Sequence, residues 1–425
     1  MKQVGVNIII SLLSACLAII LIEALLRVYT YPLYPYGQNS CELKEGRNTI
    51  CDYDPVLGWK IRPNTKAINI CDEYATLEYF NSKGVRGPEY PYAKDEDEYR
   101  ILIIGDSFAE GWTVNFDDLF SEILKRNLNT ALNRHFEVIN AGVRGYSTDQ
   151  ELLFFQNEGK KYNPDLVIVI FYDNDVWYNG RPLFFGTDKP LFRLENGILS
   201  LTNVPVPRPD EYKTEDRVET RSVKGKDSKL EKIRQWLDRH SYLYRALRKR
   251  VKSVYCIHSL AIKLRLTALQ KADDYNTSYN KNVSFPSEYN AYKKAYSDDI
   301  ARSWKITEAL LVQLNKETIA AGGRLLVVYT PSRACIYPKE WQSVKRRCGF
   351  SDKDWDAGQI GAELSSICRK NSISLIDTMK LFKFKTHKLK QQLYSRGTDN
   401  HLNRNGHRFL GDIISQYIIS NLKMK

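Results

Sequence analysis

Five short apolar segments govern how this 425-residue chain can fold. Each is separated from the next by a stretch with helical periodicity; the segments are YRILIIGDS at 99–107, FEVIN at 136–140, PDLVIVIFY at 164–172, GRLLVVYT at 323–330 and SLIDT at 374–378. Continuous apolar runs of this length are typical of strands that are buried on both faces. Because strands joined through helices need crossover connections, the pattern predicts an α/β fold: a doubly wound parallel sheet in a three-layer α/β/α arrangement.

One large insertion interrupts this pattern over residues 180–290. Its first part, PLFRLENGILSLTNVPVP, predicts a β-hairpin around Asn196 and Gly197. Its second part, from Lys226 to Leu269, has the apolar spacing of amphipathic helices with basic residues on the other side. Such helices lie on a membrane surface or cover an active-site cleft, and the spacing fits both.

The net charge of +13 is concentrated in this insertion. From Arg221 to Lys271 the chain has 15 Lys and Arg residues against three acids. A patch of this kind binds anionic headgroups, acidic glycan or nucleic acid, or it forms a solvated face without a partner. Because no recognition motif lies beside it, we expect no nucleic-acid partner.

The N-terminus contains a separate apolar feature. Residues 4–26 read VGVNIIISLLSACLAIILIEALL, with a single charge at Glu23, and their length is close to the ~20 residues that cross a bilayer. Because the apolar run continues past the small residues where a signal peptide would be cleaved, we expect residues 1–28 to form an uncleaved membrane anchor, with a lipidated Cys16 as the alternative. The aromatic and Pro-rich segment 29–37 resembles an interfacial belt. Lys2 is balanced by Arg27, so the flanking charges decide little about the orientation. We expect the rest of the chain to lie outside the cytoplasm, in the periplasm or at the cell surface.

The remaining organisation follows from the sheet. We expect a lead-in of loops and short strands at 29–98, the α/β/α domain at 99–179 and 291–425, and the basic, partly helical insertion between them. The eight cysteines lack zinc spacing, so we expect no metal site and no cofactor. In an oxidising compartment Cys335 would pair with Cys348, and a second pair would come from Cys41, Cys51 and Cys71.

Polar residues follow the strands at the edge where a doubly wound sheet binds its ligands. Ser107 follows the first strand, Gly145 the second and Asn174 the third, and Asp399 with His401 lies in TDNHLNRNGH at 398–407. Ester chemistry needs a hydroxyl activated by an imidazole, an acid that orients the imidazole, and donors for the oxyanion. We therefore expect a catalytic triad of Ser107, His401 and Asp399, with an oxyanion hole made by the N–H groups of Ser107 and Gly145 and the amide of Asn174.

These residues resemble the SGNH or GDSL hydrolases, a family named for a Ser, Gly, Asn and His in four separate blocks. ILIIGDSFAEG resembles the first block, INAGVRGYS the second, VIFYDND the third and DNHLNRNGH the last, so the resemblance covers residues 99–178 and 323–421. It implies a flavodoxin-like sheet, Ser107 as nucleophile, Gly145 and Asn174 in the oxyanion hole, and Asp399 with His401 as the acid and base. The lead-in motifs YDPVLGWKIRPNT and NSKGVRGPEY resemble those of membrane-anchored bacterial members, including ones associated with surface polysaccharide modification.

Two positions depart from the family pattern. Asp173 stands where Gly is usual, so that the backbone freedom or the charge of the site would differ. The acid usually lies three residues before the His, where this chain has Thr398; Asp399 is the expected substitute, and a backbone carbonyl is the alternative partner of the imidazole. His407, beside Gly406, is interpreted as a helix-surface residue rather than a second base.

Taken together, these patterns predict a serine-dependent esterase that acts on acyl esters of an envelope carbohydrate or glycolipid. Water as acceptor gives a hydrolase, whereas a sugar hydroxyl gives an O-acetyltransferase that modifies a surface polysaccharide. The alternative from another class is a non-catalytic glycan-binding or assembly protein with the same fold. Trp112, Trp177 and Tyr178, which lie close to the motifs, either stack on sugar rings or pack in the core or rim.

Overall fold

The computed structural model describes residues 6, 7, 11, 14, 17–25, 50–70, 73–208, 287–395 and 399–421. The chain divides into two compact units, Met1–Asn39 with Thr214–Thr277 and Ser40–Lys213 with Ser278–Lys425. In the first unit, residues 17–25 form a helix. None of the helices in the described ranges combines the length and the apolar character that crossing a membrane requires. The basic segment 221–271 and much of the apolar segment 4–26, including Cys16, lie outside the described residues.

The second unit is built on a parallel sheet of five strands in the order β13, β12, β7, β5, β6. Each predicted apolar segment forms one of them: β5 (Glu98–Gly105), β6 (His135–Asn140), β7 (Leu166–Tyr172), β12 (Arg324–Thr330) and β13 (Ser374–Asp377). Strand β5 is buried along its whole length, as expected for a strand that is covered on both faces. The order of the strands reverses at β5, which confirms the predicted flavodoxin-like, doubly wound fold.

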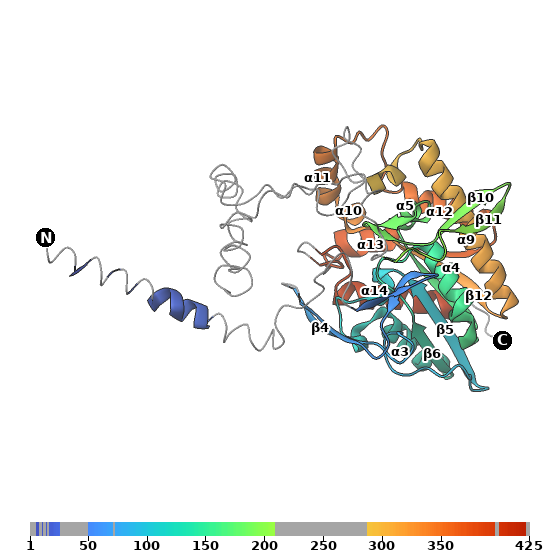
Figure 1. Cartoon of the computed structure of the whole chain (residues 1–425), viewed down its shortest axis with the longest axis horizontal. Coiled ribbons are helices and arrows are strands. Elements are labelled where there is room, and N and C mark those ends of the chain that lie inside the picture. Colours follow the sequence, from blue (N-terminus) through green and yellow to red (C-terminus); the bar gives the residue numbers. More distant parts are fainter. Residues whose placement is uncertain are drawn as a thin grey trace. The chain divides into compact units, whose positions relative to one another are not determined.

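Helices cover both faces of this sheet (Figure 1). Right-handed crossovers on either side of β5 place α3 (Phe120–Leu132) and α4 (Thr148–Asn157) on opposite faces. Helix α14 (Arg404–Asn421) packs against α3, and α9 (Asp298–Ala320) packs against α4 and β12. Helix α12 (Gln359–Lys370) lies beside β13. The three-layer arrangement is therefore the predicted one.

Shorter elements connect these layers. The short helices are α2 (Ser107–Glu110), α5 (Asp175–Asn179), α10 (Arg333–Ile336), α11 (Pro338–Cys348), α13 (Met379–His387), and the 3-10 helices η1 (Phe116–Asp118), η2 (Gly159–Tyr162) and η4 (Ser287–Tyr292). The antiparallel hairpins are β1 (Cys51–Asp54) with β2 (Gly58–Ile61), β3 (Lys66–Ile70) with β4 (Ala75–Tyr79), β8 (Leu183–Phe184) with β9 (Thr187–Asp188), and β10 (Leu191–Glu195) with β11 (Ile198–Thr202).

The last of these hairpins is the one expected at the start of the insertion. Glu195 pairs with Ile198, so the turn consists of Asn196 and Gly197. Both turn residues have positive φ, 51° and 80°, which is the backbone of the tight turns that favour Asn-Gly. The hairpin prediction is confirmed.

The disulfide considered between Cys335 and Cys348 does not form, because Cys335 is a free thiol. Its sulfur is buried and receives a hydrogen bond from the Ser332 hydroxyl at 3.3 Å. Burial raises the pKa of the Cys335 thiol to about 12, which makes it a packing group rather than a nucleophile. Cys41 and Cys71 lie outside the described residues.

Candidate active site

Ser107 is the first residue of helix α2, and only Asp106 separates it from strand β5. Asp106 caps this helix, because its carboxylate accepts a hydrogen bond from the N–H of Phe108 at 2.8 Å. Burial raises the pKa of Asp106 to about 6, against the effect of that hydrogen bond. The cap thus holds the turn that presents Ser107 at the carboxyl edge of the sheet, next to the end of β7.

The side chains of Ser107, His401 and Asp399 form one continuous chain of contacts. The Oγ of Ser107 lies 2.7 Å from Nε2 of His401, and Nδ1 of His401 lies 2.6 Å from Oδ1 of Asp399. Both distances are within hydrogen-bonding range. The same Asp399 oxygen accepts the backbone N–H of His401 at 2.9 Å. The imidazole therefore has a carboxylate, not a backbone carbonyl, as its partner, and Thr398 lies outside the described residues.

Asp399 is also held by three groups from other parts of the chain. Its Oδ2 accepts hydrogen bonds from the hydroxyl of Tyr74 and from Nε1 of Trp112, the second at 3.3 Å. Its backbone carbonyl accepts a hydrogen bond from the guanidinium of Arg333 at 3.1 Å. Burial alone would raise the pKa of Asp399, but the hydrogen bond and charge of His401, with the Tyr74 hydroxyl, hold it well below its usual range. Asp399 is consequently an anion at neutral pH.

Aromatic rings confine the imidazole of His401. The ring of Trp112 lies 4.3 Å from it and that of Phe108 lies 4.8 Å from it, measured between centroids. Trp112 therefore packs against the triad. Trp177 and Tyr178 are buried, so the structure supports the packing interpretation for these two residues rather than a sugar-stacking platform.

The two residues expected to complete the oxyanion hole lie at the same edge of the sheet. Gly145 belongs to the loop between β6 and α4 and has a φ of 80°, where a side chain is strained. A Cβ there would also lie 2.7 Å from the ring of Phe184. Asn174 follows β7 and precedes α5, and its Oδ1 is buried with no hydrogen-bond partner in the described part of the chain. An oxyanion held here would face donors from three loops that follow three neighbouring strands.

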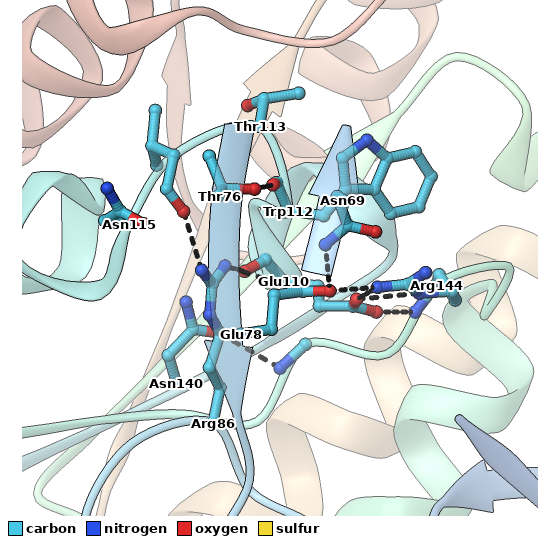
Figure 2. A network of polar contacts seen from close by, with 12 residues as sticks. Asn69, Thr76, Glu78, Arg86, Glu110, Trp112, Thr113, Asn115, Asn140 and Arg144 are labelled. Carbon is cyan, nitrogen blue, oxygen red and sulfur yellow. Dashed lines mark hydrogen bonds and ion pairs between the residues drawn. The ribbon is translucent and has the colours of Figure 1, made fainter. Parts of the chain in front are cut away.

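The loop of Gly145 is held against helix α2, which begins with Ser107. The N–H of Arg144 donates to Oε2 of Glu110 at 2.6 Å, and Nε of Arg144 donates to Oε1 of Glu110 at 2.7 Å (Figure 2). Glu110 is the last residue of α2, the helix that begins with Ser107. A Cβ at Gly142 would lie only 2.4 Å from the backbone nitrogen of Glu110, so the close approach needs glycine. Ser107 and the loop of Gly145 are thus held together.

Glu110 and Arg144 belong to a buried charge network with Glu78 and Arg86 (Figure 2). Oε2 of Glu78 lies 2.6 Å from Nη2 of Arg144, and Oε1 of Glu78 lies 3.6 Å from Nη1 of Arg86. Burial raises the pKa of Glu110 to about 7, although Arg144 opposes this shift. For Glu78, burial acts in the same direction, but the charges of Arg144 and Arg86 outweigh it and lower the pKa.

Asp173, the residue that departs from the family pattern, is engaged in packing. Its carboxylate accepts hydrogen bonds from the hydroxyl of Tyr329 at 2.5 Å, from the N–H of Ser332 at 2.8 Å, and from the hydroxyl of Tyr292. Burial raises its pKa. Asp173 therefore joins the end of β7 to the loop after β12 and to η4.

The interpretation of His407 as a surface residue is wrong. His407 is buried, with an exposed fraction of 1%, because α14 packs this side of the helix against α3. Its Nδ1 accepts the N–H of Phe120 at 3.4 Å, and its Nε2 lies 3.4 Å from the hydroxyl of Thr113. Burial lowers the pKa of His407 to about 3.

This burial predicts an acid-sensitive contribution to stability. Between the ordinary pKa of 6.5 and the lowered value of about 3, the unfolded chain binds a proton at His407 that the folded chain does not. Stability therefore falls as pH falls, by about 2 kcal/mol between pH 7 and pH 5 from this group. Urea unfolding of His407→Gln and of the unchanged protein at both pH values measures the difference; equal pH slopes would contradict the prediction.

One group of described residues has the spacing of a cation site. Asp95, Glu98 and His135 place ligand atoms within 4.8 Å of one another. They lie at the amino ends of β5 and β6, whereas Ser107 follows the carboxyl end. Glu98 is already paired with Arg100 at 2.5 Å, and that guanidinium would repel a cation.

Several residues of the site were not predicted from sequence. Tyr74 and Arg333 lie outside the four blocks, and no local pattern marks them. Glu110 and Arg144, in contrast, lie inside the blocks GDSFAEG and NAGVRGYS. An acidic residue in one block and a basic residue in the other are a signal for an ion pair, because such residues are almost never buried unless they are paired.

Part of this chain matches a known protein family. Residues 103–281 match the model of the GDSL-like lipase/acylhydrolase family. A search of the curated proteins finds no relative. Among solved structures, an acetyl xylan esterase, AlAXEase, has 14% identity and a TM-score of 0.37, with 75% of this chain and 99% of the other covered. A lipase/acylhydrolase from Enterococcus faecalis has 12% identity and a TM-score of 0.37 over 77% and 98% of the two chains. At this level of similarity, the solved structures add nothing on substrate.

Proposed function

We propose that Ser107 is the nucleophile of this chain, an ester-bond hydrolase whose residues 103–281 match the model of the GDSL-like lipase/acylhydrolase family. The observation that supports this role is the contact of 2.7 Å between Ser107 Oγ and His401 Nε2, continued by the contact of 2.6 Å between His401 Nδ1 and Asp399. A neutral imidazole in this position accepts the hydroxyl proton, and an ionised carboxylate stabilises the imidazolium that forms.

The reaction then proceeds in two halves. Ser107 Oγ attacks the ester carbonyl carbon while its proton moves to Nε2 of His401, and the developing oxyanion is held by the N–H groups of Ser107 and Gly145 and the amide of Asn174. The intermediate collapses as His401 returns the proton to the leaving alcohol, which leaves an acyl group on Ser107. Water, deprotonated by His401, releases the acid and restores the hydroxyl. A sugar hydroxyl in place of water would give the transferase.

We further propose that the substrate is an acyl ester of a carbohydrate or glycolipid in the cell envelope. The support comes from the sequence: the apolar run at 4–26, the basic segment 221–271, and lead-in motifs like those of membrane-anchored members of the family. A basic surface attracts acidic glycans and anionic headgroups. The site is also open to solvent, because the side chains of His401 and Asp399 retain 19% and 12% of their exposure.

Phosphonate labelling tests the role of Ser107 before the natural substrate is known. The purified chain is treated with a fluorophosphonate and its intact mass is measured, with Ser107→Ala as the matched control. We expect one adduct, on Ser107, together with turnover of 4-nitrophenyl acetate, and neither in the variant. If the chain is neither labelled by the fluorophosphonate nor able to hydrolyse 4-nitrophenyl acetate, the proposal is wrong and a non-catalytic role is favoured.

A further inference from the structure

Strand β4 presents every second side chain to the active site. Residues 74, 76 and 78 share one face of this extended segment, as the two-residue repeat of a strand requires. The side chains of Thr76 and Glu78 are buried, whereas Ala75 and Leu77 on the other face are exposed. This segment lies outside residues 103–281, the part of the chain that matches the family model.

Each inward side chain reaches a different part of the site. Tyr74 donates its hydroxyl to Oδ2 of Asp399. The hydroxyl of Thr76 donates to the backbone carbonyl of Trp112 at 2.5 Å, and Glu78 pairs with Arg144 at 2.6 Å (Figure 2). Strand β4 and the residue before it therefore contact the acid of the proposed triad, the backbone of Trp112, and the loop of Gly145.

We propose that β4, with Tyr74 directly before it, positions the active site, and that Tyr74 is the positioning residue for Asp399. The inference rests on the proposed role of the triad. Oδ1 of Asp399 is occupied by His401, and a carboxylate held only there can still turn about its own bond. The Tyr74 hydroxyl fixes the second oxygen with a charge-assisted hydrogen bond, which is stronger than one between neutral groups.

The other groups that face Asp399 do not replace this contact. Trp112 Nε1 reaches Oδ2 at the longer distance of 3.3 Å. Arg333 donates to the backbone carbonyl, not to the carboxylate. Loss of the Tyr74 hydroxyl therefore leaves Asp399 ionised but less precisely oriented, and it increases the negative potential at the imidazole.

Tyr74→Phe tests the proposal, because it removes one hydroxyl and keeps the ring. With 4-nitrophenyl acetate we expect kcat to fall roughly tenfold with little change in KM, the size expected for one hydrogen bond to a charged group. The acidic limb of the pH profile of kcat/KM should move to higher pH, since the more negative carboxylate favours the imidazolium. Loss of packing alone does not produce this shift.

Leu77→Thr is the matched control on the outward face of the same strand, and it should retain the pH profile and kcat. Circular dichroism and Tm establish that both variants fold. A folded Tyr74→Phe with unchanged kcat and pH profile overturns the inference while leaving the proposed function intact. Failure of the unchanged protein to hydrolyse the ester or to label at Ser107 refutes the function instead.

Discussion

Ser107→Ala, His401→Ala and the double variant are expected to lose the same amount of activity. Removal of either side chain ends the transfer of the hydroxyl proton. Removal of the other side chain should therefore cause no further loss of activity. By analogy with serine hydrolases, each loss in kcat should be roughly 10³- to 10⁶-fold. Initial rates with 4-nitrophenyl acetate, measured for all three variants against the uncatalysed rate, provide the comparison. The contact of 2.7 Å between the two side chains is the structural reason for this non-additivity.

His135→Ala is the control for the loss of a histidine. His135 is exposed at the start of β6, at the opposite end of the sheet from Ser107, and its replacement should leave kcat unchanged. Losses that multiply in the double variant would show that Ser107 and His401 act independently. In that case another pair of residues would have to carry the reaction.

The sheet could be predicted because its signal is local. Strands such as LVIVIFY in β7 are buried along their length, and uninterrupted apolar residues are required wherever both faces of a strand are covered. Helix α11, PKEWQSVKRRC, was not predicted, because most of its 11 residues are polar. The surface assignment of His407 failed for a related reason: an isolated polar residue on a helix does not reveal which face is turned inward.

The site could be predicted only in part. Ser107, Asp399 and His401 stand in short motifs that can be recognised in the chain itself. The contact of Tyr74 with Asp399, in contrast, joins residues 325 positions apart, and only the folded chain brings them together. The same holds for Glu78 and Arg144, whose charges give no sign of their pairing until β4 lies beside the loop of Gly145.

Arg144→Met is expected to give the largest loss of stability among the changes considered. It removes the guanidinium that lies against both Glu78 and Glu110 and leaves two buried carboxylates to share Arg86. Breaking a buried pair from one side costs about 3–5 kcal/mol, because the remaining charge stays desolvated without its partner. Urea unfolding at pH 8 measures this loss. The exposed Arg408 on α14 provides the control, since Arg408→Met removes the same charge from the surface.

The loss of stability in Arg144→Met should also depend on pH in a defined direction. Burial already raises the pKa of Glu110 to about 7, and Arg144 is the charge that opposes this shift most. Without Arg144, the pKa of Glu110 in the folded protein rises further above its value in the unfolded chain. The folded protein with a protonated Glu110 is therefore stable at low pH, and its free energy of unfolding falls as pH rises through the folded pKa. The difference in free energy of unfolding between Arg144→Met and the unchanged protein should therefore be smaller at pH 5 than at pH 8. An equal deficit at both values would mean that the network is held by packing and not by charge.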